Sequence, residues 1–131
     1  MSSKSVRVGA VQMQIMRVLW TRERATAREI TDELSKNGDT AHSTVQTLLR
    51  KLEAKGAVGH EVEGRTFVFH PLVTEAEVRR SATRELLSRI FDGSPVGLVA
   101  HLVRHEHISP DELEEIRKLI QEADGGDGGS P

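Results

Sequence analysis

Residues 41–56 constrain the fold more than any other stretch, because they separate apolar from polar side chains at helical spacing. Apolar residues recur at i, i+3, i+4 and i+7, the spacing of a stripe that faces a core. They are Val45, Leu48, Leu49 and Leu52. The other side carries short polar and cationic side chains, namely His42, Ser43, Thr44, Gln46, Thr47, Arg50 and Lys51. The pattern predicts a helix with one buried and one open face, ended by Lys55-Gly56.

A shorter helix is expected directly before this one. Thr26 and Glu29 have the spacing of a capping box, in which each side chain accepts a hydrogen bond from the backbone of the other. Ile30 and Leu34 continue the helix on its inner side, and Asn37-Gly38-Asp39 ends it. Two short helices with a tight connection make a helix-turn-helix.

An apolar helix is expected before this pair, and a β-hairpin after it. The apolar residues of the first helix are Val11, Ile15, Met16, Val18, Leu19 and Trp20. Residues 57–62 and 66–70 are rich in strand formers and flank Glu63-Gly64-Arg65. A glycine turn between two such runs predicts a hairpin, which would form a wing beside the helix-turn-helix.

Three amphipathic helices are expected in the remainder of the chain. Residues 74–91 carry a long apolar stripe, residues 96–103 are mostly apolar, and Ser109-Pro110-Asp111-Glu112 has the signals of a helix start. These helices are too short to form a core of their own, so they need a partner surface. We expect a second copy of the chain, which gives a two-fold homodimer; folding back onto the first domain is the alternative.

The predicted fold is therefore mainly α with a small β-hairpin: a winged helix-turn-helix domain followed by a helical dimerisation region. We place the DNA-binding domain at residues 1–73, the dimerisation region at 74–123 and a disordered tail at 124–131. The chain contains no cysteine, no run of about eighteen apolar residues and no apolar signal-peptide core at its start. These features predict a cytoplasmic protein.

The charge is distributed unevenly, although the net charge is only −2. Residues 1–73 hold 11 Lys and Arg against 8 Asp and Glu, for +3, whereas residues 74–131 hold 7 against 12, for −5. A mildly basic first part can neutralise phosphates, and an acidic second part would be repelled by them. The distribution favours a DNA contact in the first part only.

The order and spacing of these pieces resemble the penicillinase-repressor family of bacterial winged-helix regulators, over roughly residues 8–123. The pieces that carry the resemblance are residues 15–20, residues 43–52 with Lys55-Gly56, the wing at 63–69, and the C-terminal residues 98–100 and 108–113. Members of this family repress β-lactamase, methicillin-resistance or copper-homeostasis genes. The resemblance therefore implies a homodimeric repressor that occludes a promoter at a pseudo-palindromic operator in double-stranded DNA, with antibiotic-resistance or stress genes as targets.

Three positions depart from the family pattern. The first helix has Gln12 and Met13 where the family usually has an acidic residue and a tryptophan. Members induced by a membrane sensor protease are cut after an asparagine in the short helix, and by resemblance the bond here is His101-Leu102. The copper-responsive branch carries C-terminal cysteines that this chain lacks, so that mechanism is not supported.

The candidate DNA-contacting residues of the helix at 41–56 are His42, Ser43, Thr44, Gln46, Thr47, Arg50 and Lys51. Among them, residue chemistry separates base reading from phosphate binding. Ser43, Thr44, Gln46 and Thr47 are the candidates for base edges, and Gln46 can pair bidentately with adenine. Arg50 and Lys51 are expected on phosphates, which position the protein without specifying sequence. Arg65 at the hairpin tip is expected to contact the DNA backbone or minor groove. A winged helix that contacts only protein is the alternative interpretation.

Histidines near the C-terminus present a further pattern. His101 and His105 stand at i and i+4, with His107 just beyond, a spacing that can bind Zn²⁺ or a similar ion. Solvated or dimer-contact histidines explain the same pattern, and no other cofactor is expected. A metal-responsive regulator is thus the alternative function. No catalytic motif occurs in a context that could assemble an active site, so the chain is not expected to be an enzyme.

Overall fold

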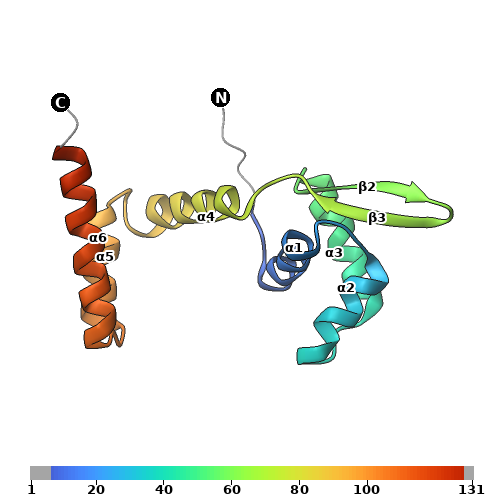
Figure 1. Cartoon of the computed structure of the whole chain (residues 1–131), viewed down its shortest axis with the longest axis horizontal. Coiled ribbons are helices and arrows are strands. Elements are labelled where there is room, and N and C mark those ends of the chain that lie inside the picture. The colour runs from blue at the N-terminus through green and yellow to red at the C-terminus, as the bar shows by residue number, and fades with distance from the viewer. Residues whose placement is uncertain (1–6, 129–131) are drawn as a thin grey trace. The chain divides into compact units, whose positions relative to one another are not determined.

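The computed structural model describes the backbone of residues 7–128, and side chains to residue 125 (Figure 1). Its elements are α1 (Ala10–Arg22), β1 (Ala25–Thr26), α2 (Ala27–Leu34), the 3-10 helix η1 (Ser35–Asn37), α3 (His42–Ala54), β2 (Val58–Glu63), β3 (Thr66–Pro71), α4 (Glu75–Ile90), α5 (Pro95–His105) and α6 (Pro110–Gly128). The chain divides into two compact units, Met1–Leu86 and Leu87–Pro131. The predicted mainly α fold with a winged helix-turn-helix is confirmed.

The core of the first unit lies where α1, α2 and α3 meet and the base of the hairpin closes over them. Its buried side chains include Ile15, Met16, Leu19, Ile30, Val45, Leu49, Leu52, Val58 and Phe69. Burial of each large apolar side chain stabilises the fold by about 1.5–3 kcal/mol. Trp20 adds a polar link, because its Nε1 donates to the carbonyl of Val73 at 2.9 Å. Val11, one of the apolar residues of the first predicted helix, is exposed.

Gln12, one of the departures from the family pattern, has a structural role in α1. It is buried, and its Oε1 accepts from the backbone N–H of Gly9, the N-cap residue, at 2.8 Å. The same oxygen lies 3.4 Å from Nζ of Lys55, at the end of α3. A neutral amide can make both contacts without placing a charge at the edge of the core.

The predicted capping box starts α2. Thr26 Oγ1 accepts from the backbone N–H of Glu29 at 3.1 Å, and Glu29 Oε1 accepts from that of Thr26 at 2.8 Å. The hydrogen bond from the Thr26 backbone lowers the pKa of Glu29 below its usual value, and nearby Arg22 lowers it further. The stop predicted at Asn37-Gly38-Asp39 is also in place, after one turn of 3-10 helix. Gly38 has a φ of 151°, which a residue with a Cβ rarely adopts.

The end of α3 is a Schellman motif, so the predicted C′ glycine is confirmed. Gly56 has a φ of 83°, and its N–H donates to the carbonyl of Glu53 at 3.0 Å. The N–H of Ala57 donates to the carbonyl of Leu52 at 2.9 Å. These two bonds satisfy carbonyls at the helix end and turn the chain directly into β2.

The hairpin belongs to a three-stranded antiparallel sheet in the order β1-β3-β2. In β1, Ala25 pairs with Phe69 and Thr26 with Val68, so the segment between α1 and α2 is attached to the wing. The sequence predicted only the hairpin, because a two-residue strand is too short to show an alternating pattern. Figure 1 shows β2 and β3 extending beyond α2 and α3.

The boundary between the two units falls inside α4, whereas the sequence placed it after residue 73. The difference arises because Val73 and Val78 are buried in the core of the first unit, so the start of α4 packs there. The apolar stripe expected along residues 74–91 is therefore divided. Val78 is buried, while Leu86 and Ile90 are exposed.

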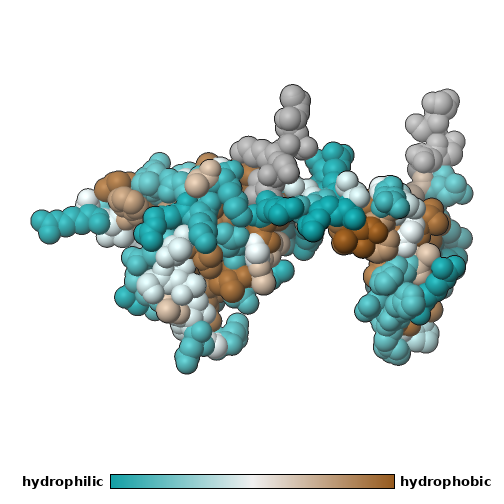
Figure 2. Space-filling model, turned by 180° about the vertical axis from the view of Figure 1, so that it is seen from behind, coloured by the Kyte–Doolittle hydropathy of each residue, from teal (hydrophilic) through white to brown (hydrophobic). Residues whose placement is uncertain are grey.

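The second unit contains α5 and α6, both with the predicted helix starts. Ser94 Oγ accepts from the N–H of Gly97 at 2.8 Å with Pro95 at the first helical position, and Ser109 and Glu112 form a capping box. Large apolar side chains of these helices are exposed: Val96, Val99, Leu102, Val103, Leu113, Leu119 and Ile120. Figure 2 shows this apolar surface in brown on the unit that carries α5 and α6.

The tail expected at residues 124–131 is helical as far as Gly128, where α6 ends. The run of good helix formers in residues 117–123 continues into this turn without a proline to stop it. Residues 129–131 lie outside the described part of the chain.

Within residues 7–128, no single helix is long and apolar enough to cross a membrane. The bent pair α4 and α5 passes that test together, by length and composition only.

We predict that Leu49→Ala destabilises the first unit by about 2–5 kcal/mol, because Leu49 is fully buried at the centre of the core. The neighbouring Leu48 is only half-buried, so Leu48→Ala is the matched control and should cost clearly less. Urea denaturation followed by circular dichroism measures both. Equal losses would contradict the packing of α3 described above.

Candidate nucleic-acid interface

The open face of α3 is the surface that the sequence predicted. Val45, Leu49 and Leu52 are buried on one side of the helix, as expected. On the other side, six of the candidate residues are exposed and His42 is half-buried; the exposed ones are Ser43, Thr44, Gln46, Thr47, Arg50 and Lys51. Ala41, the N-cap residue, makes no side-chain cap. The first turn of the helix is therefore uncapped, and its free N–H groups and the positive end of the helix dipole lie next to the short polar side chains.

A two-residue turn places Arg65 at the tip of the wing. Glu63 pairs with Thr66 across the hairpin, so only Gly64 and Arg65 make the turn. Gly64 has a φ of 66°, as a type II′ turn requires at its first central position. Arg65 is exposed there.

A groove of about 450 Å³ lies between α2, α3 and the wing. Three arginines line it, one from each part: Arg28 of α2, Arg50 of α3 and Arg65 of the wing. His42 and Gln46 also face it. Sequence reasoning missed Arg28, which stands two residues after the N-cap Thr26. Its position in the first turn of the helix that precedes α3 was the available signal.

The wing is attached to α3 through His60. The Nδ1 of His60 lies 2.7 Å from Oε2 of Glu53, and its ring stacks on Phe67 with ring centroids 4.1 Å apart and planes 12° apart. Phe67 is half-exposed and also lines the groove. These contacts set the position of the wing relative to the recognition face.

The carboxylates of β2 face Arg24, in the segment before β1. Arg24 forms an ion pair with Glu63, and its Nη2 lies 3.9 Å from Oε1 of Glu61. Since all three side chains are exposed, each pair stabilises the fold by about 0–1 kcal/mol. Their larger effect is electrostatic, because Arg24 offsets negative charge on a wing whose tip carries Arg65.

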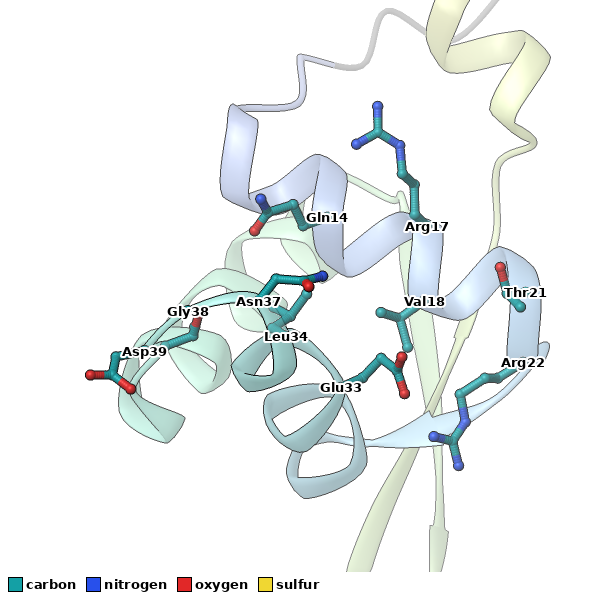
Figure 3. A pocket seen from close by; sticks show the side chains of 11 residues that line it. Gln14, Arg17, Val18, Thr21, Arg22, Glu33, Leu34, Asn37, Gly38 and Asp39 are labelled. Carbon is teal, nitrogen blue, oxygen red and sulfur yellow. The ribbon is translucent and has the colours of Figure 1, made fainter.

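A second cavity, of about 690 Å³, lies in the first unit among α1, α2 and the segment before α3 (Figure 3). Arg22 and Glu33 point toward it beside Val18, whereas Asp39 points away. Arg22 is paired with Glu29 at 3.3 Å, and Glu33 with Lys36 at 3.2 Å. Two of the charged groups on this side, Arg22 and Glu33, are thus already paired within the protein.

The histidines of the second unit do not form the three-ligand metal site considered from the sequence. The rings of His101 and His105 are 4.8 Å apart, as their i, i+4 spacing predicts. However, α5 ends at His105 and Glu106 is extended, so His107 does not continue the helical face. Among the described residues, no group of three or more His, Cys, Asp or Glu side chains could hold a metal ion. The ring of His101 instead contacts that of Phe91, at 5.7 Å.

The bond His101-Leu102, identified by resemblance as a cleavage position, lies inside α5. Both residues are exposed. A protease that binds its substrate in an extended form would therefore have to unwind this helix first.

The sequence is similar to known proteins along most of its length. The family model described as penicillinase repressor matches residues 8–122. The penicillinase repressor of Bacillus licheniformis is 28% identical over 119 residues, which are 91% of this chain and 93% of that protein. The methicillin resistance regulatory protein MecI of Staphylococcus aureus is 25% identical over 120 residues, which are 92% of this chain and 98% of that protein.

Solved structures show the same likeness in three dimensions. The solution structure of the DNA binding domain of the repressor BlaI matches with a TM-score of 0.52 and 33% sequence identity. The match covers 58% of this chain and 93% of that domain. A winged-helix domain of the kind described above is thus common to both.

Proposed function

Since this chain belongs to the penicillinase repressor family, it is a DNA-binding transcriptional repressor and not an enzyme, and we propose that it acts as a homodimer that occludes a promoter. Each copy would place α3 in the major groove at one half of a pseudo-palindromic operator, with half-sites about one helical turn apart. Antibiotic-resistance or stress genes are the proposed targets. The cytoplasm is the proposed location, because the operator is there.

The open polar face of α3 is the observation that carries this proposal. Ser43, Thr44, Gln46 and Thr47 are assigned to base edges, since they are exposed and lie toward the start of the helix. Arg50, Lys51 and Arg65 are assigned to phosphates or, for Arg65, the minor groove. We add Arg28 to the phosphate contacts, because it shares the groove with Arg50 and Arg65.

The exposed apolar side chains of α5 and α6 support the proposed homodimer. Val99 is 50% exposed, Leu119 is 62% exposed and Ile120 is 61% exposed, on helices that carry no fully buried residue among those described. A stable monomer rarely leaves so many large apolar groups in water, and a two-fold partner would cover them. This supports residues 74–123 as the dimerisation region, with its first turns anchored in the winged-helix core.

Induction requires that the dimer or its grip on DNA be weakened. By family resemblance, we propose a membrane sensor protease that acts on the His101-Leu102 bond. Cleavage in α5 would separate α6 from the rest of the chain. The proposed dimer would then lose the exposed apolar side chains that α6 contributes. The histidine before this bond, in place of the family's asparagine, requires a protease of different specificity.

The two alternative functions receive less support. A winged-helix module that binds only protein is disfavoured, because the chain belongs to a family of DNA-binding repressors. A metal-responsive regulator built on His101, His105 and His107 lacks a three-ligand group within the described residues.

Mapping of the bound protein across the genome by cross-linking and sequencing tests the proposed function. Enrichment at promoters, with a two-fold symmetric sequence under the peaks, is the expected result. A distribution without promoter enrichment would remove the proposal of promoter occlusion.

Two substitutions should separate base reading from phosphate binding. Gln46→Ala should lower affinity for the operator by about 1–3 kcal/mol and relax preference at one base pair, with little change on scrambled DNA. Arg65→Ala should weaken binding to both DNAs and reduce the magnitude of the log–log salt slope by roughly one. Fluorescence anisotropy titrations at several salt concentrations measure both effects. Equal losses on both DNAs for Gln46→Ala, or an unchanged slope for Arg65→Ala, would contradict the assigned role.

The proposed dimer can be tested by placing charge on the exposed apolar surface. Wild-type protein should sediment at twice 14.5 kDa, and Ile120→Glu should convert it to the monomer and weaken operator binding about a hundredfold. Leu72→Glu, at an exposed leucine of the first unit, is the control and should remain dimeric. Sedimentation equilibrium gives the mass. A monomeric wild type, or an Ile120→Glu variant that stays dimeric, would refute the interface.

A further inference from the structure

Thr31 and His42 make a polar contact where α2 meets the start of α3. Thr31 is only 5% exposed, and its Oγ1 lies 2.9 Å from Nδ1 of His42. The same hydroxyl lies 2.8 Å from the carbonyl oxygen of Ala27, one turn earlier in α2. Each of these distances is typical of a hydrogen bond.

Counting hydrogens determines which group donates. A hydroxyl has one hydrogen and two lone pairs, whereas a carbonyl oxygen can only accept. The hydrogen of Thr31 must therefore lie between Oγ1 and the Ala27 carbonyl, since two oxygen atoms at 2.8 Å repel each other without one. Thr31 then accepts from His42, and Nδ1 of His42 must carry a proton.

The opposite arrangement leaves an unfavourable contact. If Thr31 donated to Nδ1, its lone pairs would face the lone pairs of the Ala27 carbonyl in a nearly water-free place, where no solvent could relieve the repulsion. The buried hydroxyl thus selects one of the two neutral tautomers of His42.

In the neutral ring of His42, the second nitrogen, Nε2, is consequently an acceptor. Nε2 has no hydrogen-bond partner among the described residues, and no buried side-chain nitrogen or oxygen there lacks a partner, so Nε2 is accessible to solvent. His42 also lines the groove with Gln46 and Arg50. In this tautomer its ring carries one free lone pair, whereas the three arginines that line the same groove carry only donors.

We propose that Thr31 fixes His42 as a hydrogen-bond acceptor for the exocyclic amino group of one operator base, which makes His42 a specificity-determining residue and Thr31 its positioning residue. The inference rests on the proposed placement of α3 in the major groove. Adenine N6 and cytosine N4 are the amino donors that the major groove displays. In neutral His42, Nε2 cannot bind a phosphate oxygen, because both atoms are acceptors, and the N–H of Nδ1 is already donated to Thr31. Its contact therefore carries sequence information, unlike those of the arginines.

The tautomer can be measured without DNA. Long-range ¹H–¹⁵N spectra of the ¹⁵N-labelled full chain at about pH 8, where free imidazole is neutral, should show a protonated Nδ1 and an unprotonated Nε2 for His42. His42→Gln assigns the signals. Thr31→Val should shift this pattern toward the other tautomer, and Thr31→Ser should retain it. A protonated Nε2 in the wild type would overturn the inference.

The base contact is measured with operator DNA in which single amino groups are removed. Purine replaces adenine, and 2-pyrimidinone replaces cytosine, one position at a time. One such change should weaken wild-type binding about two- to tenfold, the range of one hydrogen bond. The same change should have no effect on His42→Phe and a smaller effect on Thr31→Val than on the wild type, while Thr31→Ser should respond like the wild type.

The two measurements distinguish failure of the inference from failure of the proposed function. Protein that binds no operator contradicts the proposed function, whatever the tautomer. Protein that binds the operator but responds to no missing amino group, or responds equally in wild type and His42→Phe, contradicts the role of His42 alone. Thermal unfolding monitored by circular dichroism verifies that the variants are folded.

Discussion

Burial of one face of α3 is the constraint on which the rest of the first unit depends. Val45, Leu49 and Leu52 have essentially no exposed surface, so the helix can rotate very little about its axis without losing them from the core. Successive residues of a helix are separated by a fixed angle, and the polar positions are thereby held outward. The same stripe that stabilises the domain therefore decides which side chains meet DNA.

The features that could be predicted from the sequence are those in which a pattern repeats along several residues or a short signal has one geometric meaning. The stripe of α3, the capping box at Thr26 and the glycine turn at Gly64 belong to this class, and each occurs as predicted. Features whose decisive partner is distant in sequence could not be predicted. The two-residue strand β1 exists because β3 is there to pair with it, and Val78 joins the first unit because a core is present beside it.

The candidate interface shows the same division. The polar face of α3 follows from spacing alone, but the groove combines residues from α2, α3 and the wing. Arg28 was missed because it belongs to a different helix, and the contact of Thr31 with His42 because 11 positions separate them. The wing, too, is oriented by His60 and Arg24, which no local pattern connects with DNA.

The contact between Thr31 and His42 has a consequence for how these two positions change during evolution. Each residue determines the hydrogen bonding of the other. An aliphatic side chain at position 31 would leave the imidazole free to carry its proton on either nitrogen. A residue other than histidine at position 42 would leave the buried hydroxyl with one fewer partner. The two positions therefore form one inherited unit. In repressors that diverged toward other operators, we expect both to have been replaced together.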